Sequence, residues 1–242
     1  MDGDGIACFD VDVQFEDISC SRCGGDGLHI AGTSSPVSRV HGTTFTFDTT
    51  IFCVSISGAT EVSLANGRCQ SSSEDGLLLQ NVEGATLRDV KIVNAGGTGL
   101  KADSCGTVST GRIETRGCAS GGIVHIWPTP RPSSSIAHET AHVVQNANAG
   151  LRIECPPSMS LDFTCSSSSF SSNLGPGVSI VCPPSTPVRC SFDRCSSGSN
   201  GGSGVELLCD PGSGVQCACS HLRCIGNGGG GLVCVSSAPT ST

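Results

Sequence analysis

Short alternating runs of apolar and polar residues recur along the whole chain at nearly constant spacing. Each run opens on a glycine followed by a branched apolar residue, and successive runs start 22 to 28 residues apart. A fixed period of this size is typical of a repeat protein, in which each unit buries its apolar face only against its neighbours. The predicted starts are Gly5-Ile6, Gly27-Leu28, Thr50-Ile51 (which fills the one gap), Gly76-Leu77, Gly99-Leu100, Gly122-Ile123, Gly150-Leu151, Gly177-Val178, Gly204-Val205 and Gly231-Leu232.

The last four repeats show the contents of one unit. Each opens with an alternating run such as residues 151–153, which has the period of a strand with one buried face. Proline, serine and glycine end that strand, and a second run follows, as at residues 161–163. An asparagine precedes the next glycine by four residues; the set is Asn146, Asn173, Asn200 and Asn227, with Cys23 and Cys118 in that place earlier and Asn94 one residue away.

This unit predicts one coil of a parallel β-helix. Two or three short strands per coil would pair with their copies in the next coil, about 4.8 Å away. An inward asparagine at a turn can bond the turn backbone and the asparagine above it. A leucine-rich repeat is the competing fold, but the serine, proline and glycine runs would break its helices. We predict an all-β solenoid of about ten coils over residues 1–235, followed by a Ser/Thr/Pro tail at 236–242.

The repeat also resembles a known superfamily. Units such as NGGSGVELLC and NAGGTGLKAD, with their Asn-x-x-x-Gly-[Leu/Val] step, are similar to the right-handed β-helix repeats of the pectin-lyase-like superfamily, from Gly5 to Val235. The resemblance implies a right-handed, single-stranded parallel β-helix with three sheets. It implies only a loose association with polysaccharides, because the superfamily includes lyases, hydrolases, adhesins, phage tailspikes and plain repeat proteins.

The seventeen cysteines follow the repeat. Two sets occupy places where other coils carry isoleucine, leucine or valine: Cys8, Cys53 and Cys234 lie three residues after a coil start, and Cys20, Cys69 and Cys224 lie seven before one. A cysteine that alternates with such residues behaves as a small buried hydrophobe, so we predict that most are free interior thiols. Cys155, Cys182 and Cys209 form a further column. No Cys-x-x-Cys pair recurs at zinc-site spacing, so no metal is expected.

Residues 138–142 match the H-E-x-x-H motif, in which two histidines on a helix bind zinc and the glutamate is the general base. Here the motif occupies the second-strand position of its coil. In a strand, residues 138, 140 and 142 share one face and Glu139 points to the other. We therefore predict a chance match on an exposed strand rather than a metalloprotease.

The same coil carries an insertion, WPTPRP at residues 127–132, with the only tryptophan. Long turns are where function is usually placed on such scaffolds. Tryptophan beside arginine and histidine suits a platform for a sugar ring, which makes five residues the candidate binding set: Trp127, Arg131, His125, His138 and His142. The alternative, which we favour, is that Trp127 covers the edge of the core and the prolines stiffen a turn.

A second candidate surface lies on the coils before the insertion. Arg88, Asp89 and Lys91 should stack beside Arg112, Glu114 and Arg116. No cofactor is expected. Polysaccharide lyases of this fold hold calcium in a carboxylate cluster and use an arginine or lysine as base, so resemblance to them would make Lys91, Arg112 and Glu114 catalytic candidates and calcium a cofactor in that case alone. No tight Asp/Glu cluster lies on adjacent coils, and the polygalacturonase motifs are missing. The alternating charges are interpreted more simply as cross-strand ion pairs.

Composition narrows the classes further. The net charge of −8 argues against a nucleic-acid partner. The chain contains no stretch of 18 apolar residues, so no membrane span is predicted. Residues 1–5 do not have the pattern of a signal peptide, so an extracellular or surface location is expected only if the chain is a fragment of a secreted protein. The threonines between residues 43 and 50 do not repeat on other coils, which argues against ice binding.

The predicted function is a non-catalytic module with a structural, adhesive or glycan-binding role. The alternative is a carbohydrate-active enzyme, a lyase or a glycoside hydrolase, acting on acidic polysaccharide. An enzyme should show converging carboxylates and a base in a groove, whereas a module should show paired charges. Open terminal coils would expose strand edges, so we expect a longer solenoid, self-association or a further chain at the ends.

Overall fold

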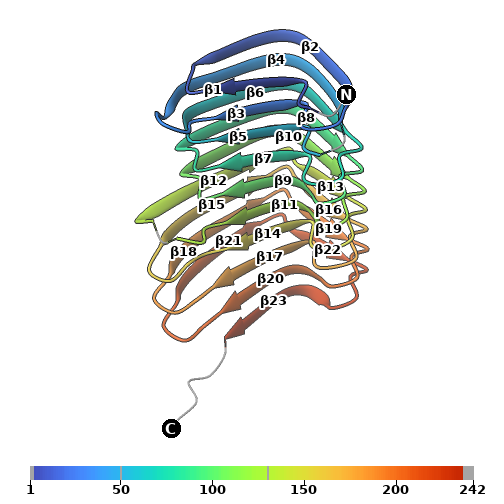
Figure 1. Cartoon of the computed structure of the whole chain (residues 1–242). Helices are drawn as coiled ribbons and strands as arrows, with labels where there is room; N and C mark the ends of the chain where they lie inside the picture. Colours follow the sequence, from blue (N-terminus) through green and yellow to red (C-terminus); the bar gives the residue numbers. More distant parts are fainter. Residues whose placement is uncertain (1–2, 50, 130, 237–242) are drawn as a thin grey trace.

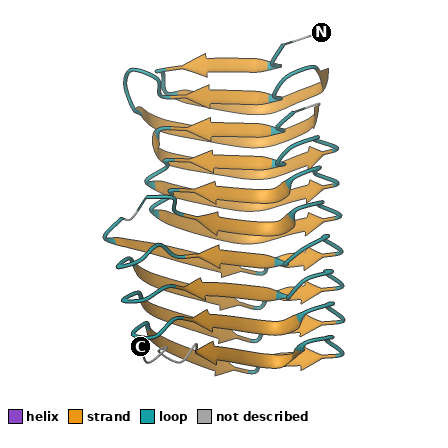
Figure 2. Cartoon of the chain, turned by 60° about the horizontal axis from the view of Figure 1, so that its bottom comes forward, coloured by secondary structure: helices purple, strands orange, loops and turns teal. Residues whose placement is uncertain are grey.

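The computed structural model describes residues 3–49, 51–129 and 131–236. All regular elements in these ranges are strands, and all strand pairs are parallel; they form a ten-stranded and a thirteen-stranded sheet. Figure 1 shows the coils stacked along one axis, from blue to red. In Figure 2 the first-sheet strands run to the left in front and the chain returns to the right behind them as it descends, which is a right-handed coil. The described residues include no helix able to span a membrane.

The ten-stranded sheet contains the first strand of every coil. In order, its strands are β1 (Ile6–Phe9), β3 (Leu28–Ala31), β5 (Val54–Ser57), β7 (Leu77–Gln80), β9 (Thr98–Asp103), β11 (Gly121–Ile126), β14 (Leu151–Glu154), β17 (Val178–Cys182), β20 (Ser203–Cys209) and β23 (Gly230–Ser236). We number the coils by these strands, so that β11 opens the sixth. Leu100 pairs with Ile123, and Ile123 with Leu151, which confirms the predicted vertical stacking.

The second sheet turns a corner and so supplies two further faces. In the first five coils one long strand runs through the corner: β2 (Val13–Cys23), β4 (Val37–Thr49), β6 (Ala59–Gln70), β8 (Gly84–Val93) and β10 (Thr107–Arg116). Later coils divide it in two: β12 (Ser133–Glu139) and β13 (His142–Val144), β15 (Ser160–Ser166) and β16 (Ser169–Ser171), β18 (Pro187–Asp193) and β19 (Ser196–Gly198), β21 (Gly214–Ser220) and β22 (Arg223–Ile225). Three faces per coil agree with the implied three-sheet architecture.

One residue in each of the first nine coils makes the corner. It adopts a left-handed backbone, with φ between 48° and 57°, and the column comprises Asp17, Thr44, Asn66, Asp89, Arg112, Thr140, Ser167, Arg194 and His221. Strand pairing is interrupted at this column and resumes beyond it. A left-handed residue reverses the inside–outside alternation expected of a continuous strand, so facing must be counted afresh after it.

One predicted coil start is wrong. Leu28 pairs with Val54, and Val54 with Leu77, so the third coil starts at Cys53-Val54. Ile51 is 37% exposed, and Thr50 lies outside the described residues. The consequence is that Cys53 occupies the glycine place rather than the place three residues later, where Ile56 pairs with Ile30. Cysteine is small enough to stand where glycine usually does, and the glycine pattern alone could not locate this start.

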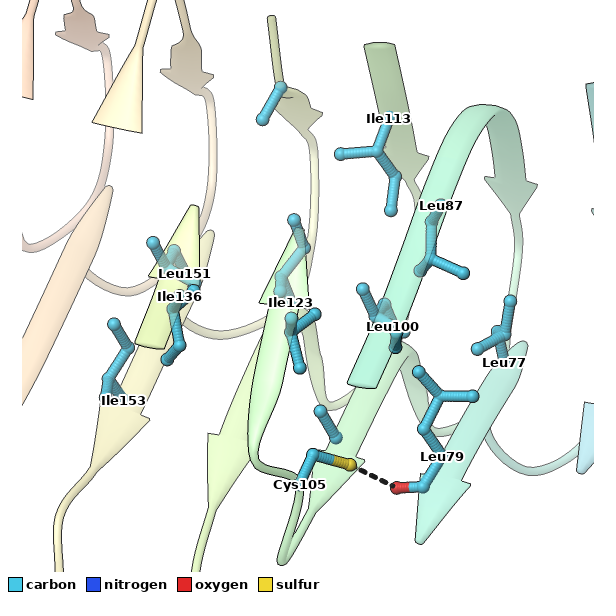
Figure 3. Packing of buried hydrophobic residues seen from close by; sticks show 14 of the residues in the cluster. Leu77, Leu79, Leu87, Leu100, Cys105, Ile113, Ile123, Ile136, Leu151 and Ile153 are labelled. Carbon is cyan, nitrogen blue, oxygen red and sulfur yellow. Dashed lines mark hydrogen bonds between the residues drawn. The ribbon is translucent and has the colours of Figure 1, made fainter. Parts of the chain in front are cut away.

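The interior consists of columns of apolar side chains. Figure 3 shows Leu77, Leu100, Ile123 and Leu151 following one another from coil to coil, and Cys105 donating its thiol hydrogen to the Leu79 carbonyl at 3.6 Å. All seventeen cysteines are unpaired in the structure, and ten are buried. One column contains three of them in the place that Ile92 and Val143 hold in other coils, as predicted. Its members are Cys20, Phe47, Cys69, Ile92, Thr115, Val143, Phe170, Ser197 and Cys224.

The predicted asparagine ladder is confirmed. The Nδ2 atoms of Asn146, Asn173 and Asn200 each donate to the Oδ1 of the asparagine in the next coil, at 3.0 Å. Each of these oxygens also accepts the backbone N–H of the asparagine above, at 3.0–3.1 Å. The backbone N–H of Cys118 donates to Asn146 in the same way. The amides are therefore satisfied although they are buried.

Candidate functional site

The corner of the second sheet brings the three catalytic candidates together. Lys91 pairs with Glu114 across β8 and β10, and Glu114 pairs with His142 across β10 and β13. Arg112 belongs to the left-handed column beside them. These residues line a surface hollow of about 340 Å³, with Asp89, Val90, Ile113 and Thr140 completing it. Residues from three coils thus share one depression on the outer surface.

The charged groups of this hollow are already paired with each other. The Lys91 Nζ donates to both carboxylate oxygens of Glu114, at 2.8 and 2.9 Å. The Arg112 Nε lies 2.5 Å from the Asp89 Oδ1. The side chains remain partly exposed, so water screens both pairs and their contribution to stability is small, about 0.2–1 kcal/mol each. Each carboxylate of the hollow has a cation against it, which is the arrangement predicted from the alternating charges.

Positive charge nevertheless exceeds negative charge across the surface around the hollow. The outer surface of residues 65–70, 88–93, 111–116 and 139–144 forms what we name the charged band. Its cations are Arg68, Arg88, Lys91, Arg112 and Arg116, and its anions are Asp89, Glu114 and Glu139. Five cations against three anions give +2, on a chain of net charge −8. A local field of this sign favours an anionic ligand.

Several arginines of the charged band have no carboxylate partner. Arg68 donates to the amide oxygen of Gln70 at 3.0 Å, and Arg116 donates to that of Gln145 at 2.9 Å. Arg88 is exposed, and among the described residues it takes part in no ion pair. Guanidinium groups held by neutral amides keep their charge available for a bidentate contact with carboxylate or sulfate.

The H-E-x-x-H motif does not converge on one site. The predicted common face for residues 138, 140 and 142 is wrong, because Thr140 is the left-handed corner residue, with φ of 57°. His138 points inward and is buried, while Glu139 and His142 are exposed. The expected exposed strand is therefore only half right. Within the described ranges, no group of three or more His, Cys, Asp or Glu could hold a metal ion.

The five candidate binding residues near the insertion are divided by the fold. Trp127 is only 4% exposed, and its Nε1 donates to the Cys105 carbonyl at 2.7 Å. His125 and His138 lie inside the core, whereas His142 lies on the outer surface of the charged band. A buried indole has no free face for a sugar ring, so these side chains form no surface platform. The alternative interpretation, that Trp127 covers the edge of the core, agrees with its contacts.

Arg131 holds the insertion against the two preceding coils. Its Nη1 donates to the Ser104 carbonyl at 2.9 Å, and its Nη2 lies 2.7 Å from the Glu83 carboxylate. Ser134 adds a bond from its hydroxyl to the Gly106 carbonyl. Pro130 of the insertion lies outside the described residues. Arg131 therefore serves as an anchor of the turn, a role that its spacing from Trp127 did not indicate.

The excess of cations in the charged band was not predicted from the sequence. Arg88 and Arg116 were recognised as neighbours of the candidate residues, but Arg68 was not included. Polar residues at one place in every apolar run, such as Asn66 and Asp89, were an available signal for the corner. Counting charges around that corner would have brought Arg68 into the set.

Comparison with known proteins yields no family model and no curated protein that matches this chain. Solved structures with some similarity include the A-module of the Azotobacter vinelandii mannuronan C-5 epimerase AlgE6, at 12% identity and a TM-score of 0.45. The match covers 88% of this chain and 65% of that one. The chain is a parallel β-helix protein. At these identities the comparison concerns fold alone.

Two further structures have the same kind of similarity. The A-module of the Azotobacter vinelandii epimerase AlgE4 shares 10% identity, with a TM-score of 0.43 and coverage of 94% of this chain and 78% of that one. The catalytic domain of a GH87 α-1,3-glucanase, solved with tetrasaccharides, shares 7% identity, with a TM-score of 0.33 and coverage of 97% and 64%. The function of this β-helix protein is therefore argued from its own surface.

Proposed function

We propose that this β-helix protein is a non-catalytic module that binds an acidic polysaccharide along the charged band. The observation that carries the proposal is the local excess of positive charge on an acidic chain. Arg68, Arg88 and Arg116 have no carboxylate partner there, whereas the carboxylates of Asp89 and Glu114 are each occupied by a cation. Such a surface attracts a polyanion, while the ion pairs hold the Asp89 and Glu114 carboxylates away from an acid or base role.

The scaffold supports this form of binding. The cations of the charged band belong to strands of successive coils, which are about 4.8 Å apart. Their spacing along the axis is therefore set by backbone hydrogen bonding and is similar to the length of one sugar residue. Because strands rather than loops carry these side chains, little backbone entropy would be lost when a ligand binds. A polymer lying along the axis could contact one coil with each of its residues.

A polysaccharide lyase or hydrolase is the second candidate. It is favoured by one observation, namely that Lys91, Arg112, Glu114 and His142 line the same hollow. Against it, the Lys91 ammonium and the Glu114 carboxylate are hydrogen-bonded to each other, so neither is directed toward a place that a substrate could occupy in the hollow. A general base or acid must reach the proton it transfers in a plausible substrate pose.

The test is a glycan array followed by titration calorimetry with polyuronates, sulfated glycans and neutral glycans. We expect binding of the anionic glycans that weakens as salt is added, because the contacts are charge-assisted. The double variant Arg88→Ala/Arg116→Ala should bind about tenfold more weakly or worse, which corresponds to about 1.4 kcal/mol. The matched control is Arg152→Ala on β14, which removes an exposed arginine from another face.

The same preparations decide between the two candidates. A uronate-lyase absorbance assay, with and without calcium, should show no product. Product formation that disappears in Lys91→Ala or Arg112→Ala would replace the non-catalytic module with the enzyme. Equal binding of neutral and anionic glycans by the parent chain and the double variant would remove the charged band from the proposal.

A further inference from the structure

A pair of buried histidines joins the two sheets inside the sixth coil. His125 extends from β11 and His138 from β12, and their Nε2 atoms lie 3.1 Å apart. Their exposed fractions are 0% and 1%. The His138 Nδ1 lies 2.8 Å from the Thr110 hydroxyl, whereas the His125 Nδ1 is buried without a hydrogen-bond partner. This pair contributes nothing to the charged band.

The contact requires that at least one of the two rings be neutral. One Nε2 must carry a hydrogen and the other must offer a lone pair. If His125 donates, the His138 Nδ1–H donates to the Thr110 hydroxyl oxygen and the His125 Nδ1 lone pair is free to take a proton, whereas the opposite arrangement would bury the His125 Nδ1–H without an acceptor. A first proton would put a positive charge inside the core, and a second would set two N–H groups against each other. Both outcomes oppose the packed structure.

Among the residues that the structure describes, no charged group compensates for a proton on this pair. On the first sheet His125 pairs with Ala102 and Ile153, and on the second His138 pairs with Thr110 and Cys165. The rings also contact Trp127 and Phe163. The titratable neighbours are the thiols of Cys105, whose backbone carbonyl accepts the Trp127 bond, and of Cys165; burial raises the pKa of Cys105 to about 11. Hydrogen bonding and burial raise the pKa of Cys165, so both thiols stay neutral.

The electrostatics of the pair follow from this surrounding. Burial lowers the pKa of His138 to about 4, and burial together with the neighbouring His138 lowers the pKa of His125 well below its usual value. A histidine in an unfolded or opened segment titrates near 6.5. The opened form therefore binds more protons than the closed form below that pH. The closed form is fully favoured above about pH 6.5 and loses stability as the pH falls toward about 4.

Trp127 connects this pair to the surface. The indole stacks on the His125 ring, with centroids 6.3 Å apart and planes 19° apart, and it rests on the turn of the fifth coil through its bond to Cys105. Beyond it, Arg131 fixes the turn by its bonds to Ser104 and Glu83, but its Nε is buried without a partner. The turn after β11 is thus held by a few hydrogen bonds and ion pairs and by the packing of the Trp127 indole against His125.

We propose that the His125–His138 pair is an acid-operated latch, whose protonation drives Trp127 from its seat and opens the turn after β11. Neutral rings hold the two sheets and the indole together. Charged rings separate, and the indole loses the surface on which it stacks. The rest of the coil stack keeps its backbone hydrogen bonds, so the opening is local.

Trp127 is the only tryptophan, so its fluorescence reports on the latch directly. On lowering the pH from about 7.5 to about 4, we expect a red-shifted emission and severalfold stronger quenching by acrylamide, with a midpoint below 6.5. The far-ultraviolet circular dichroism should stay unchanged over the same range. The double variant His125→Gln/His138→Gln should show no transition, while the control His142→Gln, exposed in the same motif, should behave as the parent does.

Three results would overturn the latch. They are an emission that stays constant to about pH 4 in the parent, a transition that persists in the double variant, and a loss of circular dichroism at the same midpoint. If the double variant does not fold, the imidazole resonances of the parent chain provide the second measurement. Two ring signals must shift at the fluorescence midpoint, and titration of exposed histidines alone would contradict the proposal.

Discussion

The five coils before Trp127 and the four that follow it stack in the same way but fill their interiors with different pairs. In the first three of the earlier coils, phenylalanine rings lie over glycines of the next coil. A Cβ added to Gly42 would lie 2.0 Å from the Phe15 ring, and one added to Gly67 would lie 2.0 Å from the Phe45 ring. In the later coils, the asparagine ladder runs beside the coil starts, and a Cβ on Gly150 would lie 2.8 Å from the Asn173 amide.

The two solutions explain the difference in coil length. A ring over a glycine restrains one contact and leaves the turns free, and the first five coils, with the corrected start at Cys53, span 22 to 26 residues. A ladder of amides requires the same turn in every coil, because each Nδ2 must meet the next Oδ1. Successive starts from Gly150 to Gly231 are all 27 residues apart. Hydrogen-bonded columns therefore fix the period more strictly than apolar columns do.

The largest effect should come from breaking a ring–glycine pair. Phe45 is buried in the core of the second coil, so Phe45→Ala should lower the free energy of unfolding by about 3–5 kcal/mol, as measured by urea titration. The control Phe9→Ala removes a ring that is 51% exposed and should cost far less. A similar loss for both variants would mean that the ring columns do not hold the earlier coils.

The partner glycine sharpens the same test. Gly67→Ala alone should cost about 1–3 kcal/mol, because the new methyl group overlaps the Phe45 ring. In the Phe45→Ala background the methyl group enters the vacated space, and the second substitution should cost little or restore stability. Double-mutant analysis measures this coupling. Strict additivity would show that Gly67 is required for its backbone rather than for the ring above it.

In the later coils, Asn173→Ala should cost about 3 kcal/mol. The substitution leaves the backbone N–H and the Nδ2 of Asn146, and the Val143 carbonyl, without their partner in a buried place. The matched control is Asn148→Ala, because Asn148 is exposed and its side chain bonds only the N–H of Ala149 among the described contacts. Equal unfolding midpoints for the two variants would argue that the ladder does not stabilise the later coils.

The features found from the sequence are those that repeat at one offset. Asn146, Asn173 and Asn200 stand at the same distance from their glycines, so their column was visible without coordinates. Cys53 was misplaced because it takes the part of a glycine. His138 was expected on an exposed strand because the left-handed Thr140 restarts the alternation. In each wrong prediction, one residue departs from the repeat in its backbone conformation or its side chain, and a pattern of repeated residues cannot indicate such a departure.

Contacts between side chains of different sheets could not be predicted from the sequence. His125 and His138 are 13 residues apart and meet inside one coil, across a turn whose length is peculiar to that coil. The Lys91–Glu114 pair, by contrast, follows from the step between neighbouring coils and was predicted. A repeat therefore specifies neighbours along the axis well, while neighbours across the interior depend on how the corners and turns are shaped.

The smallest change in stability is expected from a substitution that extends the asparagine ladder into the earlier coils. Cys118 already occupies the ladder place, and its backbone N–H donates to Asn146. In Cys118→Asn the new amide could donate to the Asn146 Oδ1, with Gly99 leaving room as Gly150 does for Asn173. We expect stability to be unchanged or raised by about 1 kcal/mol in urea titrations.

The control for this variant is Ala95→Asn, one coil earlier in the same column, where the residue below is Cys118 rather than an asparagine. Its amide would be buried with no oxygen of the next side chain to receive it, so this variant should be destabilised by about 1–3 kcal/mol. If both variants lost the same stability, the two halves would differ in more than the identity of one column. A gain confined to Cys118→Asn would show that the earlier coils can adopt the ladder, and that the ladder propagates only from an asparagine already in place.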